Sequence, residues 1–304
     1  GWTKQLLLVL NKLNLNLKID VIISSYSPVS SLIAGLKFKK KYPDVHFIAD
    51  FRDEMSFSPY LTNKRKSFFQ KIEKDIFDSA SLVLSVSGPI VSKYNKIYNS
   101  KKCIEIRNGF DFNYTMDYNH GIKWRIFHIG TFYGQSKPYN FFYALEKLIN
   151  KYPEIENIID LNFVGIKNNY VVPKRFLKLL KQEEIVDHES ALNRMKKADL
   201  LLLFIPDNGR KGVFSGKLFE YLGSNRPILG MLDTEDVASE LIKQSNSGRA
   251  VSFSNIDEIS NSLEAFYFDW KNKVGFLQNE NIVKLQSRER QIKKLSNQIF
   301  NLLK

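Results

Sequence analysis

The chain has 304 residues, 43% of them hydrophobic, which is enough for two α/β domains with sizeable cores. It contains no run of about 20 apolar residues, so no spanning helix is expected, and its one cysteine, Cys103, excludes an internal disulfide and a cysteine zinc site. The formal net charge of +13 predicts acidic partners: nucleic acid, nucleotide phosphates or anionic lipid.

Short apolar runs alternate with amphipathic segments along the first 110 residues. The expected helices and strands, in chain order, are helix 6–17, strand 20–25, helix 30–40, strand 46–51, helix 67–79, strand 81–87, helix 90–98 and strand 103–107. Strands that are apolar throughout and alternate with helices indicate a parallel sheet covered on both faces.

A second series of the same kind follows the polar segment 111–123. Its expected strands are 125–131, 160–165, 185–186, 199–204, 227–231 and 249–253, and its expected helices are 140–151, 173–182, 190–198, 215–224, 234–245, 256–270 and 281–304. The sequence therefore predicts an α/β protein with two doubly wound, Rossmann-like parallel-sheet domains. We expect domains at 1–115 and 116–278, and a C-terminal helix at 279–304 that crosses back to the first domain.

The segment 215–229 predicts a capped helix that leads directly into a strand. Ser215 is a suitable N-cap, and Pro227 stops any continuation. Lys217 places a cation in the first turn, where it opposes the positive end of the helix dipole. An anion bound at the helix start would remove that conflict, whereas the alternative is a solvated pair of Lys217 and Glu220 on a surface helix. Other polar groups also follow predicted strands, at 24–27, 50–53, 108–109, 130–137 and 207–216, and together they outline an interdomain cleft.

These residues resemble the GT-B glycosyltransferases, specifically the family 4-like group 1 enzymes. The matching segments, which arrive in the family's order and cover nearly the whole chain, are DVIISS (20–25), IADFRD (48–53), SLVLSVS (81–87), IRNGFD (106–111), IGT (129–131) with Lys137, and above all GKLFEYL (216–222) with RPIL (226–229). The resemblance implies that the C-terminal domain holds a nucleotide diphosphate sugar and that the N-terminal domain presents the acceptor.

The resemblance also implies roles for individual donor-side residues. The turn at Gly130 and Thr131 would approach the diphosphate, Lys137 and Lys217 would neutralise it, and Glu220 would accept hydrogen bonds from the donor ribose. The remaining expected donor-binding residues are Ser215 and Gly216 at the helix start and Asp207, Val213 and Phe214 on the loop that faces the sugar. No cofactor is expected, and no metal site, because His46, His128 and His188 do not make a ligand set. Fixed cations and helix amides would stabilise the leaving diphosphate.

On the acceptor side we expect Asp50 or Asp53, with Arg52, to orient or deprotonate the acceptor. The alternative is that Asp50, Arg52 and Asp53 form a structural ion pair. Two departures from the family bear on activity. Gly212 stands where many relatives carry a glutamate, and the first βαβ portion that GT-B enzymes usually have is not found before the strand at 20–25. Both keep open a non-catalytic nucleotide-sugar binder or a truncated fragment, and the exposed sheet edge predicts a homo-oligomer or a partner chain.

The expected function is a glycosyltransferase that retains anomeric configuration and builds a surface polysaccharide or glycolipid from a saccharide or lipid-linked acceptor. A GT-B sugar-nucleotide epimerase is the alternative enzyme, although its acidic and histidine catalytic set is not visible. We expect a cytoplasmic protein, since one cysteine suits a reducing compartment and no signal peptide is evident. Aromatic and basic residues that predict contact with an anionic membrane surface, or else an ordinary solvated helix, are Phe57, Tyr60, Lys64, Arg65, Lys66, Phe68 and Phe69. No nucleic-acid partner is expected, because no recognised motif accompanies the charge.

Overall fold

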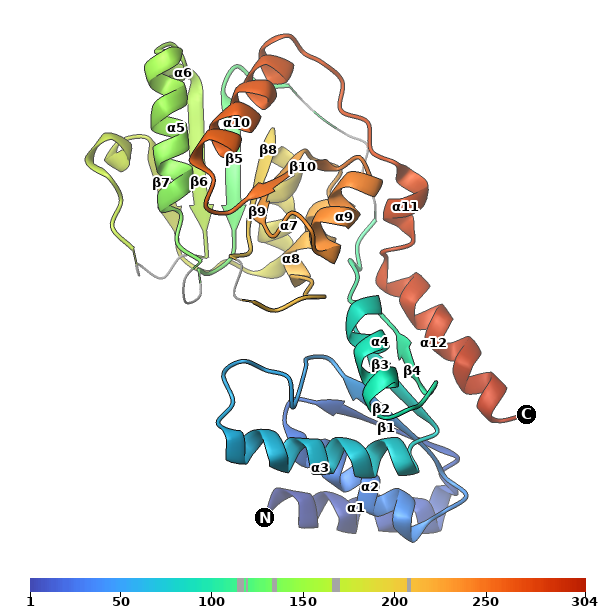
Figure 1. The fold of residues 1–304 in the computed structure, drawn as a ribbon. Coiled ribbons are helices and arrows are strands. Elements are labelled where there is room, and N and C mark those ends of the chain that lie inside the picture. Colours follow the sequence, from blue (N-terminus) through green and yellow to red (C-terminus); the bar gives the residue numbers. More distant parts are fainter. Residues whose placement is uncertain (114–117, 119, 133–135, 166–169, 207–208) are drawn as a thin grey trace. The chain divides into compact units, whose positions relative to one another are not determined.

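The computed structural model describes all residues except 114–117, 119, 133–135, 166–169 and 207–208 (Figure 1). The chain forms two compact units. The first unit comprises Gly1–Asn108, Gly209–Val213 and Gln291–Lys304, and the second comprises Gly109–Asn208 and Phe214–Arg290.

The first unit is built on a parallel sheet of four strands in the order β1-β2-β3-β4. The strands are β1 (Val21–Tyr26), β2 (His46–Phe51), β3 (Leu82–Ser85) and β4 (Cys103–Glu105), and the helices between and before them are α1 (Trp2–Leu17), α2 (Val29–Lys41), α3 (Asn63–Ser79) and α4 (Gly88–Ile97). Alternate residues of a strand point to opposite faces of the sheet. On β2, Phe47, Ala49 and Phe51 pack with α2, α3 and α4, whereas Ile48 faces the other side.

That other side is covered by α12 (Arg288–Leu302), which supplies Leu295, Ile299 and Leu302 at helical spacing. The sheet is therefore buried on both faces at β2, β3 and β4, as a parallel sheet requires.

The second unit has six parallel strands in the order β10-β9-β8-β5-β6-β7. The strands are β5 (Trp124–Ile129), β6 (Ile159–Val164), β7 (Leu180–Glu183), β8 (Leu200–Phe204), β9 (Ile228–Leu232) and β10 (Gly248–Ser252). The helices are α5 (Tyr139–Lys151), α6 (Ile155–Ile158), α7 (His188–Lys197), α8 (Gly216–Gly223), α9 (Val237–Gln244), α10 (Ile256–Lys271) and α11 (Glu280–Lys284).

The helices of the second unit cover both faces of its sheet. Residues of α5 and α10 pack on one face, and residues of α7, α8, α9 and α11 pack on the other (Figure 1). The strand order reverses between β5 and β8, and in open α/β sheets ligands bind beyond the carboxyl ends of the strands at such a point.

Two of the expected helices are wrong. The segment expected as helix 173–182 holds a 3₁₀ turn, Lys174–Leu177, and then β7, whose residues pair with β6 from Leu161↔Leu180 onward. The strand expected at 185–186 is therefore also wrong, because the strand of this region is β7. The C-terminal helix expected from 281 is two helices, α11 and α12. It is interrupted because Ser287 bridges to Phe110 and the Arg288 amide donates to the Phe110 carbonyl at 2.7 Å.

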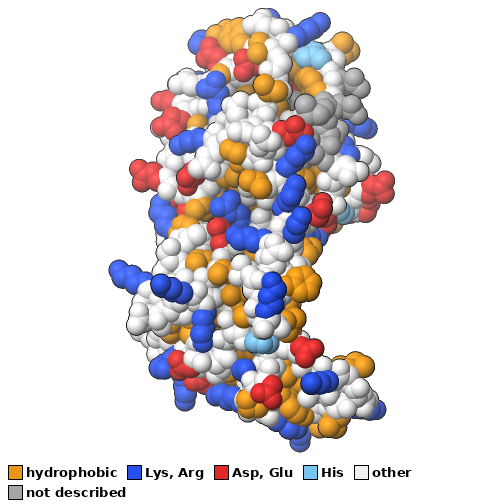
Figure 2. Space-filling view, turned by 90° about the vertical axis from the view of Figure 1, so that its right-hand side faces the viewer, with side chains coloured by type: hydrophobic (Ala, Val, Ile, Leu, Met, Phe, Trp, Pro, Cys, Tyr) orange, Lys and Arg blue, Asp and Glu red, His pale blue; other side chains and the backbone are white. Residues whose placement is uncertain are grey.

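Two surface properties bear on the composition. Within the described residues, no helix combines the length and the apolar character needed to cross a bilayer. On the face shown in Figure 2, Lys and Arg side chains are spread widely and interspersed with Asp and Glu. The net positive charge therefore marks no single binding surface on that face.

Candidate functional site

The candidate donor site begins where β5 and β6 end. Gly130 has φ +130° and donates its amide to the Val164 carbonyl at 2.7 Å, while Thr131 Oγ1 donates to the Gly165 carbonyl at 2.9 Å. Gly165 also has a positive φ, and a Cβ there would lie 3.3 Å from the Gly130 Cα. The two glycines therefore let the ends of β5 and β6 approach closely.

Lys217 lies directly across this turn. A Cβ on Gly130 would collide with the Lys217 side chain, and Lys217 Nζ donates to the Thr131 carbonyl at 3.3 Å. Burial lowers the pKa of Lys217, and the charge of Glu220 opposes that shift. A partly dehydrated cation is thus fixed beside the half-buried backbone of the turn.

Helix α8 presents its N-terminus at the same place. Ser215 has an extended backbone, as an N-cap should, but within the described residues its side chain forms no cap hydrogen bond. The helix is aligned by Tyr221, whose hydroxyl accepts a hydrogen bond from the Ile129 amide at 3.0 Å inside the core. Since Lys217 lies one turn before Tyr221 on the same face, this bond fixes Lys217 next to the end of β5.

Glu220 lies in a cluster of charged groups. His188 Nδ1 is 3.8 Å from Glu220 Oε1, and His188 Nε2 is 3.7 Å from Asp111 Oδ1. Arg288 holds Asp111 at 2.6 Å. Burial, and to a smaller extent Asp111, raises the pKa of Glu220, while His188, Lys217 and Arg288 act against the rise.

Sequence reasoning missed the place of His188 in this cluster. The available signal was its position at the start of a helix, α7, that follows a strand of the same sheet.

The structure brings Gly130, Thr131, Ser215, Gly216, Lys217 and Glu220 together in the second unit. Phe214 packs against Phe219 of α8 with ring centroids 5.3 Å apart. Lys137 is partly exposed, one residue beyond Ser136, whose hydroxyl donates to the carbonyl of Phe204 at the end of β8. Val213 is grouped with the first unit, and Asp207 lies outside the described residues.

The expected acceptor-side residues lie in the first unit. Asp50 is buried, accepts a hydrogen bond from the Ser25 hydroxyl at 2.8 Å, and forms an ion pair with Arg52 at 3.1 Å. Arg52 also donates to Asn108 at 2.7 Å. Asp53 is exposed, and its carboxylate lies 3.7 Å from a guanidinium nitrogen of Arg210. These contacts favour the structural ion pair for Asp50 and Arg52, whereas Asp53 is not part of it.

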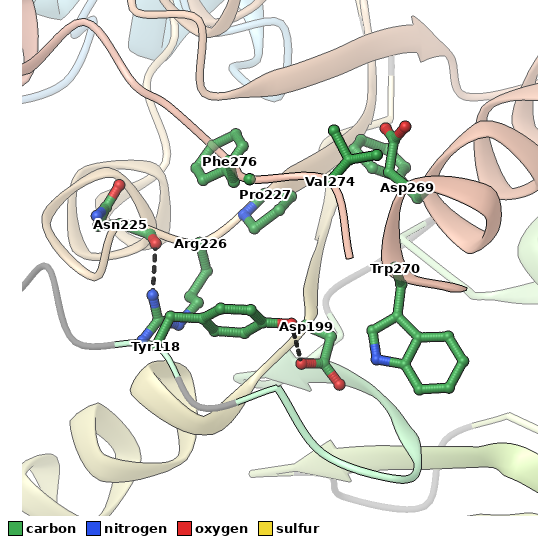
Figure 3. Close-up of a pocket in the computed structure, with 11 residues that line it drawn as sticks. Tyr118, Asp199, Asn225, Arg226, Pro227, Asp269, Trp270, Val274 and Phe276 are labelled. Carbon is green, nitrogen blue, oxygen red and sulfur yellow. Dashed lines mark hydrogen bonds between the residues drawn. The ribbon is translucent and has the colours of Figure 1, made fainter. Parts of the chain in front are cut away.

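A separate cavity of about 150 Å³ lies at the amino-terminal ends of strands in the second unit's sheet (Figure 3). Its wall includes Asp199 and Pro227, which precede β8 and β9, so it is remote from the carboxyl strand ends. Asp199 accepts hydrogen bonds from Tyr118 at 2.7 Å and from Arg125. These bonds give Asp199 a structural role. Among the described residues, no three His, Cys, Asp or Glu side chains are grouped so as to hold a metal ion.

Two parallel-sheet α/β units with a glycine turn and a helix N-terminus at a strand switch point are the architecture of the GT-B class. Solved structures confirm the GT-B fold. An α,α-trehalose-phosphate synthase (UDP-forming) from Burkholderia xenovorans, in complex with glucose-6-phosphate, matches with TM-score 0.66 and 11% identity over 100% of this chain and 78% of that one. The N-terminal domain of Candida albicans trehalose-6-phosphate phosphatase matches with TM-score 0.69 and 12% identity over 96% and 72% of the two chains.

S. aureus TarM, in complex with fondaparinux, α-GlcNAc-glycerol and UDP, matches with TM-score 0.57 and 12% identity. The match covers 88% of this chain and 58% of TarM, so the chain spans a little over half the length of that neighbour. No protein-family model and no curated protein matches the sequence. The narrower likeness to the family 4-like group stays a prediction.

Proposed function

We propose that the protein is a glycosyltransferase that takes a sugar from a nucleotide diphosphate sugar and attaches it to an acceptor hydroxyl. The observation that carries the proposal is Lys217, held across the Gly130 turn beside the N-terminus of α8, where the side chain of the N-cap Ser215 makes no cap hydrogen bond within the described part of the chain. The N-terminal end of α8, with its positive dipole, and a fixed cation lie at one place, which is the arrangement that binds a phosphate group.

The reaction would need little covalent help from the protein. The bond between the sugar's anomeric carbon and the diphosphate oxygen breaks, the acceptor oxygen bonds to that carbon, and the acceptor's proton is released. Negative charge grows on the leaving diphosphate, where Lys217 and the amides of α8 would stabilise it. Lys137 would add a second cation, and Glu220, held near His188, would accept the ribose hydroxyls.

Several finer points belong to the same proposal. The TarM structure contains UDP and the Burkholderia synthase is UDP-forming, which supports a UDP-sugar as the donor. We further propose a saccharide or lipid-linked acceptor in polysaccharide or glycolipid synthesis, with retention of configuration. The competing function is a nucleotide-sugar binder without catalysis, favoured by Gly212 at the position where many members of the resembled family carry a glutamate.

The direct test is calorimetric titration of the chain with UDP, GDP, ADP and dTDP, followed by their sugar conjugates. We expect one nucleotide class to bind in the micromolar range and Lys217→Ala to weaken it at least about tenfold, the effect of one charge-assisted hydrogen bond. Lys243→Ala, at an exposed lysine of α9, is the matched control and should leave binding unchanged. No binding of any nucleotide would refute the donor site.

A second measurement separates an enzyme from a binder. Release of the free nucleotide from the sugar conjugate, followed by mass spectrometry with and without sugar acceptors, reports turnover. A chain that binds the conjugate tightly but releases no nucleotide with any acceptor is a binding protein.

A further inference from the structure

The first unit contains two buried glutamates whose surroundings differ sharply. Glu73 on α3 accepts four hydrogen bonds, at 2.8 and 2.6 Å from the amide and hydroxyl of Ser56 and at 3.2 and 2.6 Å from Tyr94 and Tyr98. An ionised carboxylate can accept about four hydrogen bonds, so the acceptor capacity of Glu73 is filled. Glu73 is therefore a structural group that ties the segment after β2 to α3 and α4.

Glu54 is also buried, but its contacts are longer. Within the described residues, its carboxylate has two cationic neighbours: Lys93 at 3.5 Å and the Nε of Arg210 at 3.4 Å. Both distances exceed the usual hydrogen-bond range of about 2.7–3.2 Å. A buried carboxylate that is held only by long ion pairs is compensated in part for its lost hydration, and it keeps room for short hydrogen bonds from a ligand.

That room lies in the cavity that Glu54 lines. The cavity has a volume of about 200 Å³ and lies wholly within the first unit. Phe57, Pro59 and Pro89 form apolar walls, and Lys93 Nζ lies 4.0 Å from the Phe57 ring centroid, which fixes its position. At about 30 Å³ per water molecule, this space holds about seven waters, so it suits one small polar ring rather than a chain.

The charges of the wall select the ligand. The residues that line the cavity include three cations, Lys93, Arg210 and Lys211, and one carboxylate, Glu54. The exposed Asp53 lies beside Arg210. A carboxylate at short range accepts hydrogen bonds from hydroxyl groups, while the cations attract an anionic substituent. The apolar walls suit the C–H surface of a sugar ring.

We propose that this cavity is the acceptor subsite of the glycosyltransferase, that it binds a sugar carrying a carboxylate or phosphate group, and that Glu54 accepts the hydrogen bonds of its hydroxyls. This inference rests on the proposed function. It assigns the acceptor-side carboxylate to Glu54 in place of Asp50, whose oxygens are already engaged by Ser25 and Arg52.

The test is titration of the full chain with glucuronic acid, glucose 1-phosphate, glucose and inorganic phosphate. We expect both anionic sugars to bind at least about tenfold more tightly than glucose or phosphate, and the tighter of the two identifies the anionic group. Lys93→Gln should weaken the anionic sugars about tenfold with little effect on glucose. Lys96→Gln, at an exposed lysine of the same helix, is the matched control. Glu54→Gln should weaken glucose and the anionic sugars alike.

Parallel titration with UDP and thermal unfolding of each variant keep the outcomes distinct. If UDP binds but neither anionic sugar does, or if Lys93→Gln and Lys96→Gln behave alike, the subsite is overturned while the donor site stands. If an anionic sugar binds in the expected pattern but no nucleotide does, the cavity is a sugar site and the glycosyltransferase proposal is overturned. Failure of both refutes both. Because Lys93 is half-exposed, its variant tests the cavity even if Glu54→Gln is unstable.

Discussion

Replacement of Gly130 by alanine is the sharpest test of the donor-site geometry. The new Cβ would collide with the aliphatic part of Lys217, and φ +130° is a conformation that L side chains rarely adopt. Backbone strain of this kind costs about 1–3 kcal/mol, and displacing the end of the Lys217 side chain from its hydrogen bond to the Thr131 carbonyl adds about 1 kcal/mol. We therefore expect Gly130→Ala to lower the free energy of unfolding by about 2–4 kcal/mol, measured by urea denaturation.

The two contributions separate in a double-mutant cycle. In a Lys217→Ala background the collision is gone and the strain remains, so the same substitution should cost at least about 1 kcal/mol less. Gly216→Ala is the matched control, because a Cβ there meets nothing within 4 Å and alanine is a better helix former than glycine. An equal loss from Gly130→Ala in both backgrounds would refute the placement of Lys217 across the turn.

Three further predictions follow from the contacts of named groups. Tyr221→Phe removes the acceptor of the buried Ile129 amide, so we expect a loss of about 1–3 kcal/mol in urea denaturation, against no more than about 0.5 kcal/mol for Tyr143→Phe at an exposed position. The raised pKa of Glu220 means that its contribution to stability is fully present below the ordinary carboxyl pKa and is lost as pH rises through the folded pKa. Glu220→Gln should therefore stabilise the unliganded chain at pH 7 relative to pH 4, and an equal effect at both pH values would contradict the burial argument. Replacing three exposed cations, close in sequence to the exposed rings of Tyr60 and Phe68, by glutamine should weaken binding to anionic vesicles about 100-fold or more, because each cation near the surface contributes about 1 kcal/mol. Those cations are Lys64, Arg65 and Lys66. The measurement is co-sedimentation with the vesicles. Wild-type chain that does not sediment with them would exclude the membrane surface.

Signals within a few residues of each other made the donor helix predictable from sequence. Ser215 before a glycine and an apolar stripe, and Pro227 after it, depend only on local backbone preferences, and the structure places α8 at Gly216–Gly223. The strand β7 was not predictable in the same way. Its segment LKQE has weak strand propensity, and its conformation is set by hydrogen bonds to β6, which lies almost 20 residues earlier.

The acceptor-side carboxylate shows the same limit at a larger separation. The sequence pattern pointed to Asp50, which lies near the end of β2, and to Asp53, and it did not select Glu54, the next residue along the chain. What distinguishes Glu54 is burial together with a cation from Arg210, 156 residues further along the chain. No local pattern carries that information, because the loop 209–213 packs with the first unit although its neighbours in sequence belong to the second.

The ionisation of the donor-side charges gives an independent reason to regard the second unit's cluster as a ligand site. Burial lowers the pKa of Lys217 and raises that of Glu220, so both charged forms are disfavoured in the unliganded chain. A surface ion pair selected for stability would shift both pKa values the other way. A diphosphate beside Lys217 would favour its charged form, and ribose hydroxyls donating to Glu220 would favour the carboxylate. The penalty carried by each group without ligand is therefore relieved by the part of the donor proposed to bind it, which is the expected trade of stability for function at a binding site.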